Sequence, residues 1–301
     1  SLRCHWTTYY KLLERESLRT QALAIAQVRW ILQSLPRLLI VEMVIDDTMV
    51  LRHSTKAPGA AIRFDHSHKH NRPSYVLAQN WVGLALTLRT RSGKAISFPI
   101  RLRLVPSTGN IHKLKIAGAL LRAFIPHIPV PVRLLTDAWF MRRRLLLPLL
   151  RQHGQFIGQV RKIPCCYLAS ETHLTASEIV SLYSNRWQIE PIFHNLKRWW
   201  GINNLWQQKR TVLERWMQIR CIAWSMVQLL AETLAEDFPM AAIAPWRIAT
   251  PVTAGLMAQW LHLQFLRVPF WKGFDPKSGK FQCSTPAFWA DADDPPCKKA
   301  A

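Results

Sequence analysis

Acidic residues are scarce in this chain. Its 301 residues include 18 Asp and Glu against 40 Lys and Arg, which gives a formal net charge of +22. A balance this basic indicates a polyanionic partner, and nucleic acid is the usual one. The positive charge is spread along the whole sequence and is not gathered on one amphipathic segment, which argues against a membrane-surface protein.

Long hydrophobic runs and paired cysteines are also missing. No stretch reaches the 18 or so uninterrupted apolar residues that span a bilayer, and the N-terminus lacks a signal-peptide pattern. The six cysteines have no CxxC spacing, which argues against structural zinc and against a disulfide framework in a chain of this length. These absences favour a protein of the reducing cytoplasm, and a hydrophobic fraction of 49% is enough for a sizeable core.

The few acids that remain occupy informative places. Only two acids occur between residues 48 and 170, against twenty Lys and Arg. Asp46 follows the apolar run 38–45, and Asp137 follows the apolar run 130–136. Both runs read as buried strands that end in a carboxylate. Carboxylates at the ends of central strands project into a shared crevice, where their burial is costly unless a cation is bound.

One stretch, residues 183–197, spaces a tyrosine, an arginine, a glutamate and a lysine at helical intervals. At 100° per residue, Tyr183, Arg186, Glu190 and Lys197 fall within an arc of about 60° on one helix. A carboxylate flanked by two cations and a phenol suits a metal-bound phosphate and the backbone around it. Arg186 and Glu190 alone could equally form an i,i+4 surface pair.

The spacing Tyr-x2-Arg-x3-Glu-x6-Lys resembles the signature of DDE transposases in the insertion-sequence-four family, and all four positions match. The sequences around Asp46 and Asp137 resemble the first and second aspartate motifs of that family. The resemblance therefore implies a catalytic triad of Asp46, Asp137 and Glu190. It also implies that this triad holds two Mg²⁺ (or Mn²⁺) ions.

The same resemblance implies roles for the other signature residues and for the partners. Tyr183, Arg186 and Lys197 are expected to bind phosphates of double-stranded DNA, both at the transposon inverted repeats and in the target DNA. Assembly as a homodimer on paired ends is expected from the family alone. No membrane partner is expected, and the location is expected to be cytoplasmic, bacterial and DNA-associated.

The identity of the first acid stays open between three residues. Asp46 continues the strand directly, whereas Asp47 is followed by a threonine and suits a turn or a helix cap. Asp65 lies in the His-rich loop 64–70, and some relatives place the first acid later in the chain. That loop lacks the closed spacing of tetrahedral zinc ligands, so it is predicted to be a solvated or phosphate-contacting loop. Asp137 could also be a helix N-cap.

The order of elements predicts a mixed α/β sheet with helices on both faces. A capping-box pattern from Thr175 to Glu178 opens the helical region that carries the signature. Strands are expected at 38–50, 74–90, 94–105, 130–136, 155–160 and 165–169, with helices at 110–124, 138–152 and 212–235. This order, with acids on the first and fourth strands and on a following helix, matches the ribonuclease H-like fold of the DDE enzymes.

Three regions are expected along the chain. Residues 1–37 are expected to form a basic helical segment, which is either the end of a DNA-binding region or a helix packed on the core. Because the sequence opens without Met, such a DNA-binding region is expected to be truncated. Residues 38–235 form the ribonuclease H-like catalytic domain. Residues 236–301 form a C-terminal segment with weak periodicity, whose role the sequence leaves unassigned.

The function expected from these features is that of a DNA transposase, which cleaves transposon ends and transfers the strands into target DNA. One departure from the family matters: only 53 positions separate Asp137 from Glu190, so the β-rich insertion common between these acids is missing or shortened. The alternatives are therefore a catalytically defective relic that only binds DNA, or a metal-dependent nuclease on the same fold.

Overall fold

The structure is a computed structural model that describes residues 6–35, 39–65, 73–90, 93–106, 110–161, 166–247, 251–267, 274–275 and 280–281. The chain divides into two compact units. The larger unit runs from Tyr9 to Leu229, and the smaller one combines Ser1–Thr8 with Leu230–Ala301. Among the described residues, no helix is both long enough and apolar enough to cross a membrane.

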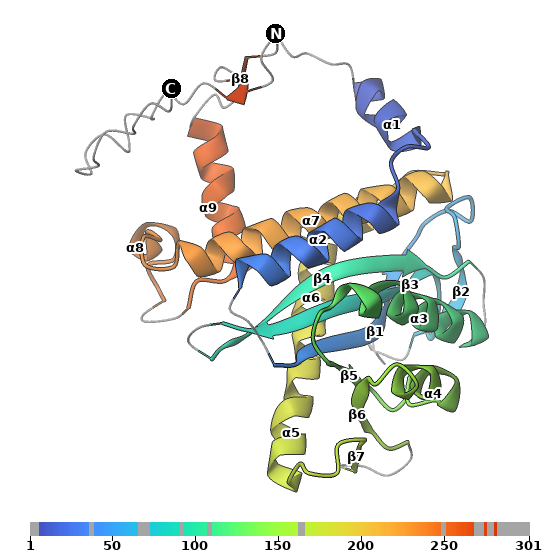
Figure 1. The fold of residues 1–301 in the computed structure, drawn as a ribbon. Coiled ribbons are helices and arrows are strands. Elements are labelled where there is room, and N and C mark those ends of the chain that lie inside the picture. Colours follow the sequence, from blue (N-terminus) through green and yellow to red (C-terminus); the bar gives the residue numbers. More distant parts are fainter. Residues whose placement is uncertain are drawn as a thin grey trace. The chain divides into compact units, whose positions relative to one another are not determined.

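A curled, mixed sheet of seven strands organises the larger unit (Figure 1). The strand order is β2-β3-β1-β5-β6-β7, and β4 pairs with β3. The central pairs β1–β5 and β5–β6 are parallel, whereas β1–β3, β2–β3, β3–β4 and β6–β7 are antiparallel. The strands are β1 (Val41–Leu51), β2 (Ala61–Phe64), β3 (Tyr75–Arg89), β4 (Ala95–Leu104), β5 (Val132–Thr136), β6 (Gln155–Gln159) and β7 (Tyr167–Ala169).

Helices flank this sheet. The larger unit contains most of α1 (Trp6–Glu14), together with α2 (Thr20–Ser34), α3 (Asn110–Phe124), η1 (Ile125–His127), α4 (Arg143–Leu150), α5 (Ala176–Ser184), η2 (Asn185–Gln188), α6 (Ile189–Arg198), η3 (Ile202–Asn204) and most of α7 (Arg210–Thr233). The smaller unit holds α8 (Met240–Ile243), α9 (Ala254–Arg267) and a hairpin of β8 (Phe274–Asp275) and β9 (Lys280–Phe281).

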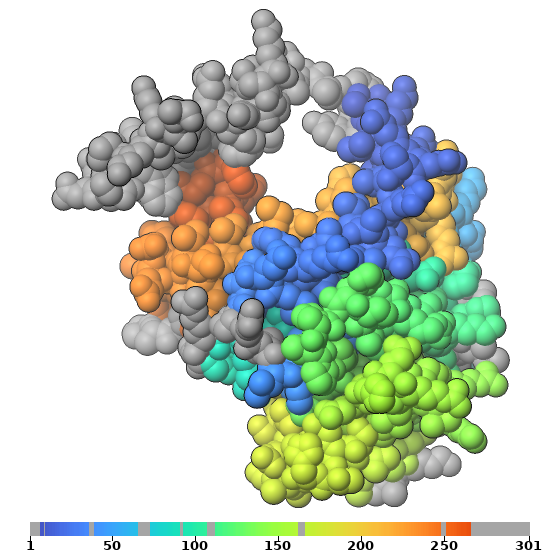
Figure 2. All heavy atoms as spheres, in the orientation of Figure 1, coloured from blue at the N-terminus to red at the C-terminus, as the bar shows by residue number. Residues whose placement is uncertain are grey.

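The alternation of side chains along β1 divides the sheet into two faces. Met43 and Ile45 belong to the main hydrophobic core, which they share with residues of α2, α3 and α4. In Figure 2 the blue surface of α2 adjoins the green surface of α3 on this side. Successive strand residues point to opposite faces, so Glu42, Val44 and Asp46 point to the other face.

Helix α6 covers that second face. The Phe193 ring lies so close to Gly83 of β3 that a Cβ there would come within 2.8 Å of a ring carbon. Gly83 pairs with Asp46 across the β1–β3 ladder. A glycine is therefore required at this position because α6 approaches the strands beside Asp46.

The predicted mixed α/β sheet with flanking helices is confirmed, with three local differences. The strand β2 was not expected, because its four residues alternate between half-buried and exposed positions and carry no strong apolar pattern. Helix α4 begins at Arg143 and not at 138. The expected single helix over 183–197 is divided into α5, η2 and α6, since residues 185–188 adopt a 3-10 turn.

Candidate catalytic site

Asp46 and Asp47 are neighbours in β1 but lie in different surroundings. Asp46 faces the α6 side of the sheet, and its Oδ2 accepts a hydrogen bond of 3.2 Å from Nη1 of Arg186. Asp47 points to the opposite side, where its Oδ2 lies 2.8 Å from Nζ of Lys113 in α3. Lys113 also lies over the Trp139 ring, 5.0 Å from its centroid. The strand alternation thus assigns each aspartate its own cation.

Asp137 follows β5, which runs parallel to β1. The ladder pairs Ile45 with Thr136, so the next residues, Asp46 and Asp137, emerge at the same edge of the sheet. The Oδ1 of Asp137 accepts hydrogen bonds from the backbone N–H groups of Trp139, at 3.1 Å, and Phe140, at 3.0 Å. This local turn delays the start of α4, which explains why the helix expected from residue 138 begins five residues later.

Arg186 joins the strand end to the helix. It lies in η2, is 8% exposed, and its Nη2 donates to Oε1 of Glu190 at 3.3 Å while Nη1 reaches Asp46. Its guanidinium carbon lies 4.9 Å from the Trp187 ring centroid and 5.8 Å from that of Tyr183. The buried Nε of Arg186 has no hydrogen-bond partner among the described residues. Glu190, at the start of α6, is more open, with a side chain 45% exposed.

The carboxyl groups of Asp46 and Asp137 both have raised pKa values. Burial, and after it the negative charge of Asp137, raises the pKa of Asp46 to about 7, and Arg186 offsets only part of that rise. Burial also raises the pKa of Asp137, although its backbone hydrogen bonds work in the opposite direction. The site therefore holds more buried negative charge than its own cation neutralises.

The remaining residues predicted for the site lie at different distances from this centre. Tyr183 is buried, packs its ring 4.5 Å from that of Tyr167, and has its pKa raised chiefly by burial. Lys197 lies seven residues beyond Glu190, about 10 Å along α6. Asp65 is buried just after β2, and the histidines that follow it in the loop lie outside the described residues.

The sequence places the chain in a known family. Residues 39–226 match the family model described as "Transposase DDE domain". The chain belongs to the DDE transposase domain family. Membership implies an enzyme of the nuclease and transposase class, and the matched region contains Asp46, Asp137 and Glu190.

No curated protein matches the sequence. A solved structure titled "Cryo-EM structure of piggyBac transposase synaptic complex with hairpin DNA" matches with 12% sequence identity and a TM-score of 0.40. The match covers 80% of this chain and 57% of that chain, so the present sequence spans little more than half the length of that transposase.

DDE transposases generally use divalent metal ions, and the residues of this site fit such an ion in chemistry. Asp46 and Asp137 offer the carboxylate oxygens that Mg²⁺ prefers, and a bound cation would offset the burial and the repulsion from Asp137 that raise the pKa of Asp46. Among the described residues, however, no group of three His, Cys, Asp or Glu side chains is close enough together to hold a metal. Arg186 lies between Asp46 and Glu190 and provides the positive charge there.

Several residues of the site were missed by sequence reasoning. Lys113 has no motif of its own, and only the fold brings it to Asp47. Gly83 is significant because of the ring above it, which the sequence does not reveal. Glu42 did carry a signal: it is the one acid inside the apolar run 38–45, and the structure buries it at 7% exposure.

Proposed function

We propose that this chain is a DNA transposase of the insertion-sequence-four type, with a ribonuclease H-like catalytic domain and the triad Asp46, Asp137 and Glu190. The observation that carries the proposal is the ion pair of Arg186 with both Asp46 and Glu190. Arg186 thus joins two acids that are 144 positions apart in sequence, and Asp137 follows the neighbouring strand β5. Asp46 and Asp137 at one sheet edge, with Glu190 on the helix that covers it, would supply the carboxylates for metal-dependent cleavage of a phosphodiester.

The three acids would hold two Mg²⁺ or Mn²⁺ ions. The chemistry that these ions supply when bound is activation of the attacking water or 3′-hydroxyl and stabilisation of the leaving oxygen. Asp46 and Asp137 would contribute ligands from the rigid ends of β1 and β5. Glu190 would contribute from α6, where its half-exposed side chain accepts a hydrogen bond of 3.3 Å from Arg186.

The basic residues of the chain would bind the DNA backbone. Arg186 would bind a phosphate oxygen through its planar guanidinium, and Lys197 would act as a second point charge along α6. Tyr183 would support Arg186 and reach a phosphate with its hydroxyl. Arg143 and Arg144, exposed at the start of α4 soon after Asp137, would extend this surface. Such contacts make binding steeply dependent on salt.

A second candidate is a defective transposase that binds DNA without cleaving it. Two observations favour it: only seven residues separate β6 from β7, too few for the β-rich insertion, and the described acids do not form a preorganised cluster of three. A nuclease that hydrolyses DNA without joining ends would differ from both candidates. Homodimerisation on paired ends belongs to the proposal in either form of transposase.

The deciding experiment is a cleavage assay on duplex DNA that carries the inverted repeats flanking the coding region, with Mg²⁺ or Mn²⁺. Wild type is compared with Glu190→Gln, which keeps the size of the side chain and removes its charge. Metal-dependent nicking at the ends that is lost in the variant, with DNA binding retained, supports a working transposase. Binding without cleavage in both proteins supports the relic, and hydrolysis without strand joining supports the nuclease.

A further inference from the structure

A second polar cluster lies on the same face of the sheet as the proposed triad, at the opposite end of β1 and β5. Glu42 precedes Asp46 by four residues in β1, and Arg133 precedes Asp137 by four residues next to it in β5, where the ladder pairs Glu42 with Arg133. Four strand residues span about 13 Å. The two parallel strands therefore carry two charged pairs, one at each end of the face that α5, η2 and α6 cover.

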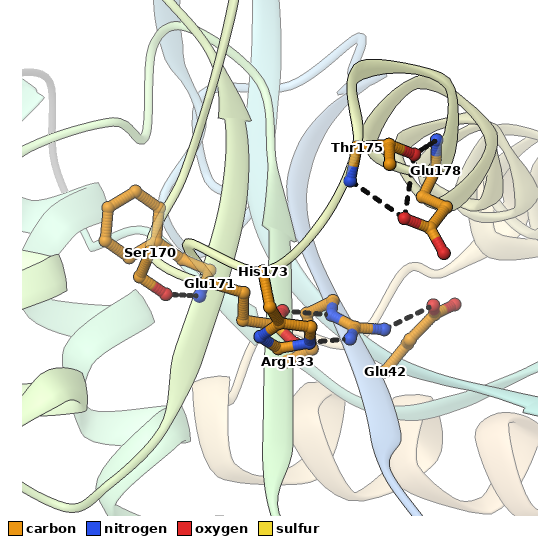
Figure 3. A network of polar contacts seen from close by, with 8 residues as sticks. Glu42, Arg133, Ser170, Glu171, His173, Thr175 and Glu178 are labelled. Atoms are coloured by element: carbon orange, nitrogen blue, oxygen red, sulfur yellow. Dashed lines mark hydrogen bonds and ion pairs between the residues drawn. The ribbon is translucent and has the colours of Figure 1, made fainter.

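This second cluster is almost completely buried. Arg133 donates from Nε and Nη2 to the two carboxylate oxygens of Glu171, at 2.5 and 2.6 Å, and its Nη1 lies 3.5 Å from Oε1 of Glu42. The exposed fractions of the three side chains are 7% for Arg133, 1% for Glu171 and 9% for Glu42. Figure 3 shows Arg133 between Glu171 on one side and Glu42 on the other.

Glu42 makes the weaker of the two ion pairs of Arg133, because its Oε1 lies 3.5 Å from Nη1 whereas Glu171 receives two shorter bonds. The Glu42 carboxylate is buried, which is costly unless further hydrogen bonds satisfy it. Its other oxygen, Oε2, accepts a hydrogen bond of 2.8 Å from Nδ2 of Asn185. Asn185 is the first residue of η2, and the next residue is Arg186.

The bond between Glu42 and Asn185 ties the turn that carries Arg186 to β1. Residues of a 3-10 turn point about 120° apart, so a turn held at Asn185 cannot rotate about its axis without breaking the bond to Glu42. With the turn held, Arg186 is directed at Asp46 and Glu190. We propose that Glu42 is a positioning residue of the cleavage site, which orients Arg186 through Asn185. This inference rests on the proposed function.

The test compares two substitutions of equal length at one position. Glu42→Gln keeps an oxygen that accepts from Asn185, whereas Glu42→Met keeps the volume and has no acceptor. We expect Glu42→Met to slow single-turnover cleavage at saturating DNA by about 10- to 100-fold, the effect of losing a hydrogen bond to a charged group. Glu42→Gln should stay within about threefold of wild type, and Asn185→Ala should match Glu42→Met.

Comparing melting temperature with cleavage rate distinguishes a positioning role of Glu42 from a merely structural one. Glu42→Met leaves Nδ2 of Asn185 and Nη1 of Arg133 without an acceptor, so it should melt at a lower temperature as well as cleave slowly. The matched control is Thr175→Ala at the other end of α5, where the Thr175 hydroxyl accepts from the Glu178 N–H (Figure 3). This variant should melt at a lower temperature and cleave at the wild-type rate. Equal cleavage by Glu42→Met and Glu42→Gln would overturn the proposal.

A readout that does not need cleavage keeps this inference separate from the proposed function. Hydrogen exchange of the backbone amides in residues 185–189 reports the opening of η2 directly. Faster exchange there in Glu42→Met, with wild-type exchange in Glu42→Gln, supports the positioning role even if the wild-type protein cleaves no DNA. Unchanged exchange in both variants overturns the role whatever the cleavage assay gives.

Discussion

Replacing Asp46 by asparagine should stabilise the folded protein at alkaline pH. Its carboxyl has an ordinary pKa of 3.8, and burial together with the charge of Asp137 raises the pKa to about 7 in the folded state. Between these values the folded protein keeps a proton that the unfolded chain has lost. Stability therefore falls as pH rises from about 4 to about 7 and is constant above that. An asparagine at position 46 does not titrate, so the variant escapes this loss.

The magnitude follows from the shift. A difference of about three pKa units, at 1.36 kcal/mol each, is on the order of 4 kcal/mol at pH 8. The Asp46 side chain is only 18% exposed, so solvent screens this cost weakly, and the Asn amide oxygen can still accept from Arg186. For a unit of about 200 residues, 4 kcal/mol corresponds to on the order of 10 °C in melting temperature. The advantage should shrink by about 2 to 3 kcal/mol on going to pH 5.

The assay is thermal unfolding of wild type, Asp46→Asn and Asp47→Asn from pH 5 to 8.5, with and without Mg²⁺. Asp47→Asn is the matched control, because it removes the adjacent charge but one that Lys113 already neutralises. Mg²⁺ should stabilise wild type at pH 8 by mass action and leave Asp46→Asn nearly unchanged. A gap between Asp46→Asn and wild type that does not vary with pH, or a variant that is less stable at pH 8, would refute the reasoning.

Three other substitutions test the arrangement around this centre. Gly83→Ala places a methyl group against the Phe193 ring, so it should lower the free energy of unfolding by about 1 to 3 kcal/mol, as measured by denaturant titration. The same variant should slow cleavage in the end-cleavage assay, because α6 moves away from the sheet. Asp47→Asn should lose the Lys113 ion pair yet keep metal-dependent cleavage; loss of all cleavage would instead make Asp47 an essential acid. Arg186→Lys should retain salt-dependent DNA binding in a filter assay but cleave at least about tenfold more slowly, because one ammonium replaces a two-sided guanidinium contact; wild-type cleavage would mean that charge alone suffices.

Much of the sheet could be predicted from the sequence because its strands are long and apolar. The central strands ending near Asp46 and Asp137 follow from β-branched and leucine-rich runs bounded by acids, and β3 and β4 follow from a Gly-containing turn between apolar stretches. The short edge strand β2 has neither feature. The interruption of the signature helix at η2 does have a sequence signal, because Pro191 has no N–H to donate and is tolerated only in the first turn of a helix, where it stands in α6.

The sequence could not decide whether Asp46 or Asp47 is the first acid of the site. Both residues follow the same apolar run, and each suits a strand end or a turn. Their environments differ because β1 extends to Leu51, beyond both acids, so strand alternation sends them to opposite faces. Asp46 then meets Arg186, and Asp47 meets Lys113. The deciding contacts come from elements 66 and 140 positions away, which no local pattern encodes.

The short connection between Asp137 and Glu190 is part of the packed fold. After β7, the Ser170 N–H donates to the Phe156 carbonyl and the Ser170 hydroxyl accepts from the Phe156 N–H, which holds the chain against β6. The next residue, Glu171, then buries its carboxylate against Arg133. A buried ion pair offsets the cost of desolvation only where the geometry is close, as it is between Arg133 and Glu171. The same pair adjoins Glu42, whose partner Asn185 orients the turn of Arg186. The described end of the segment between the second and third acids therefore contacts, through Arg133 and Glu42, the residues that we propose position Arg186.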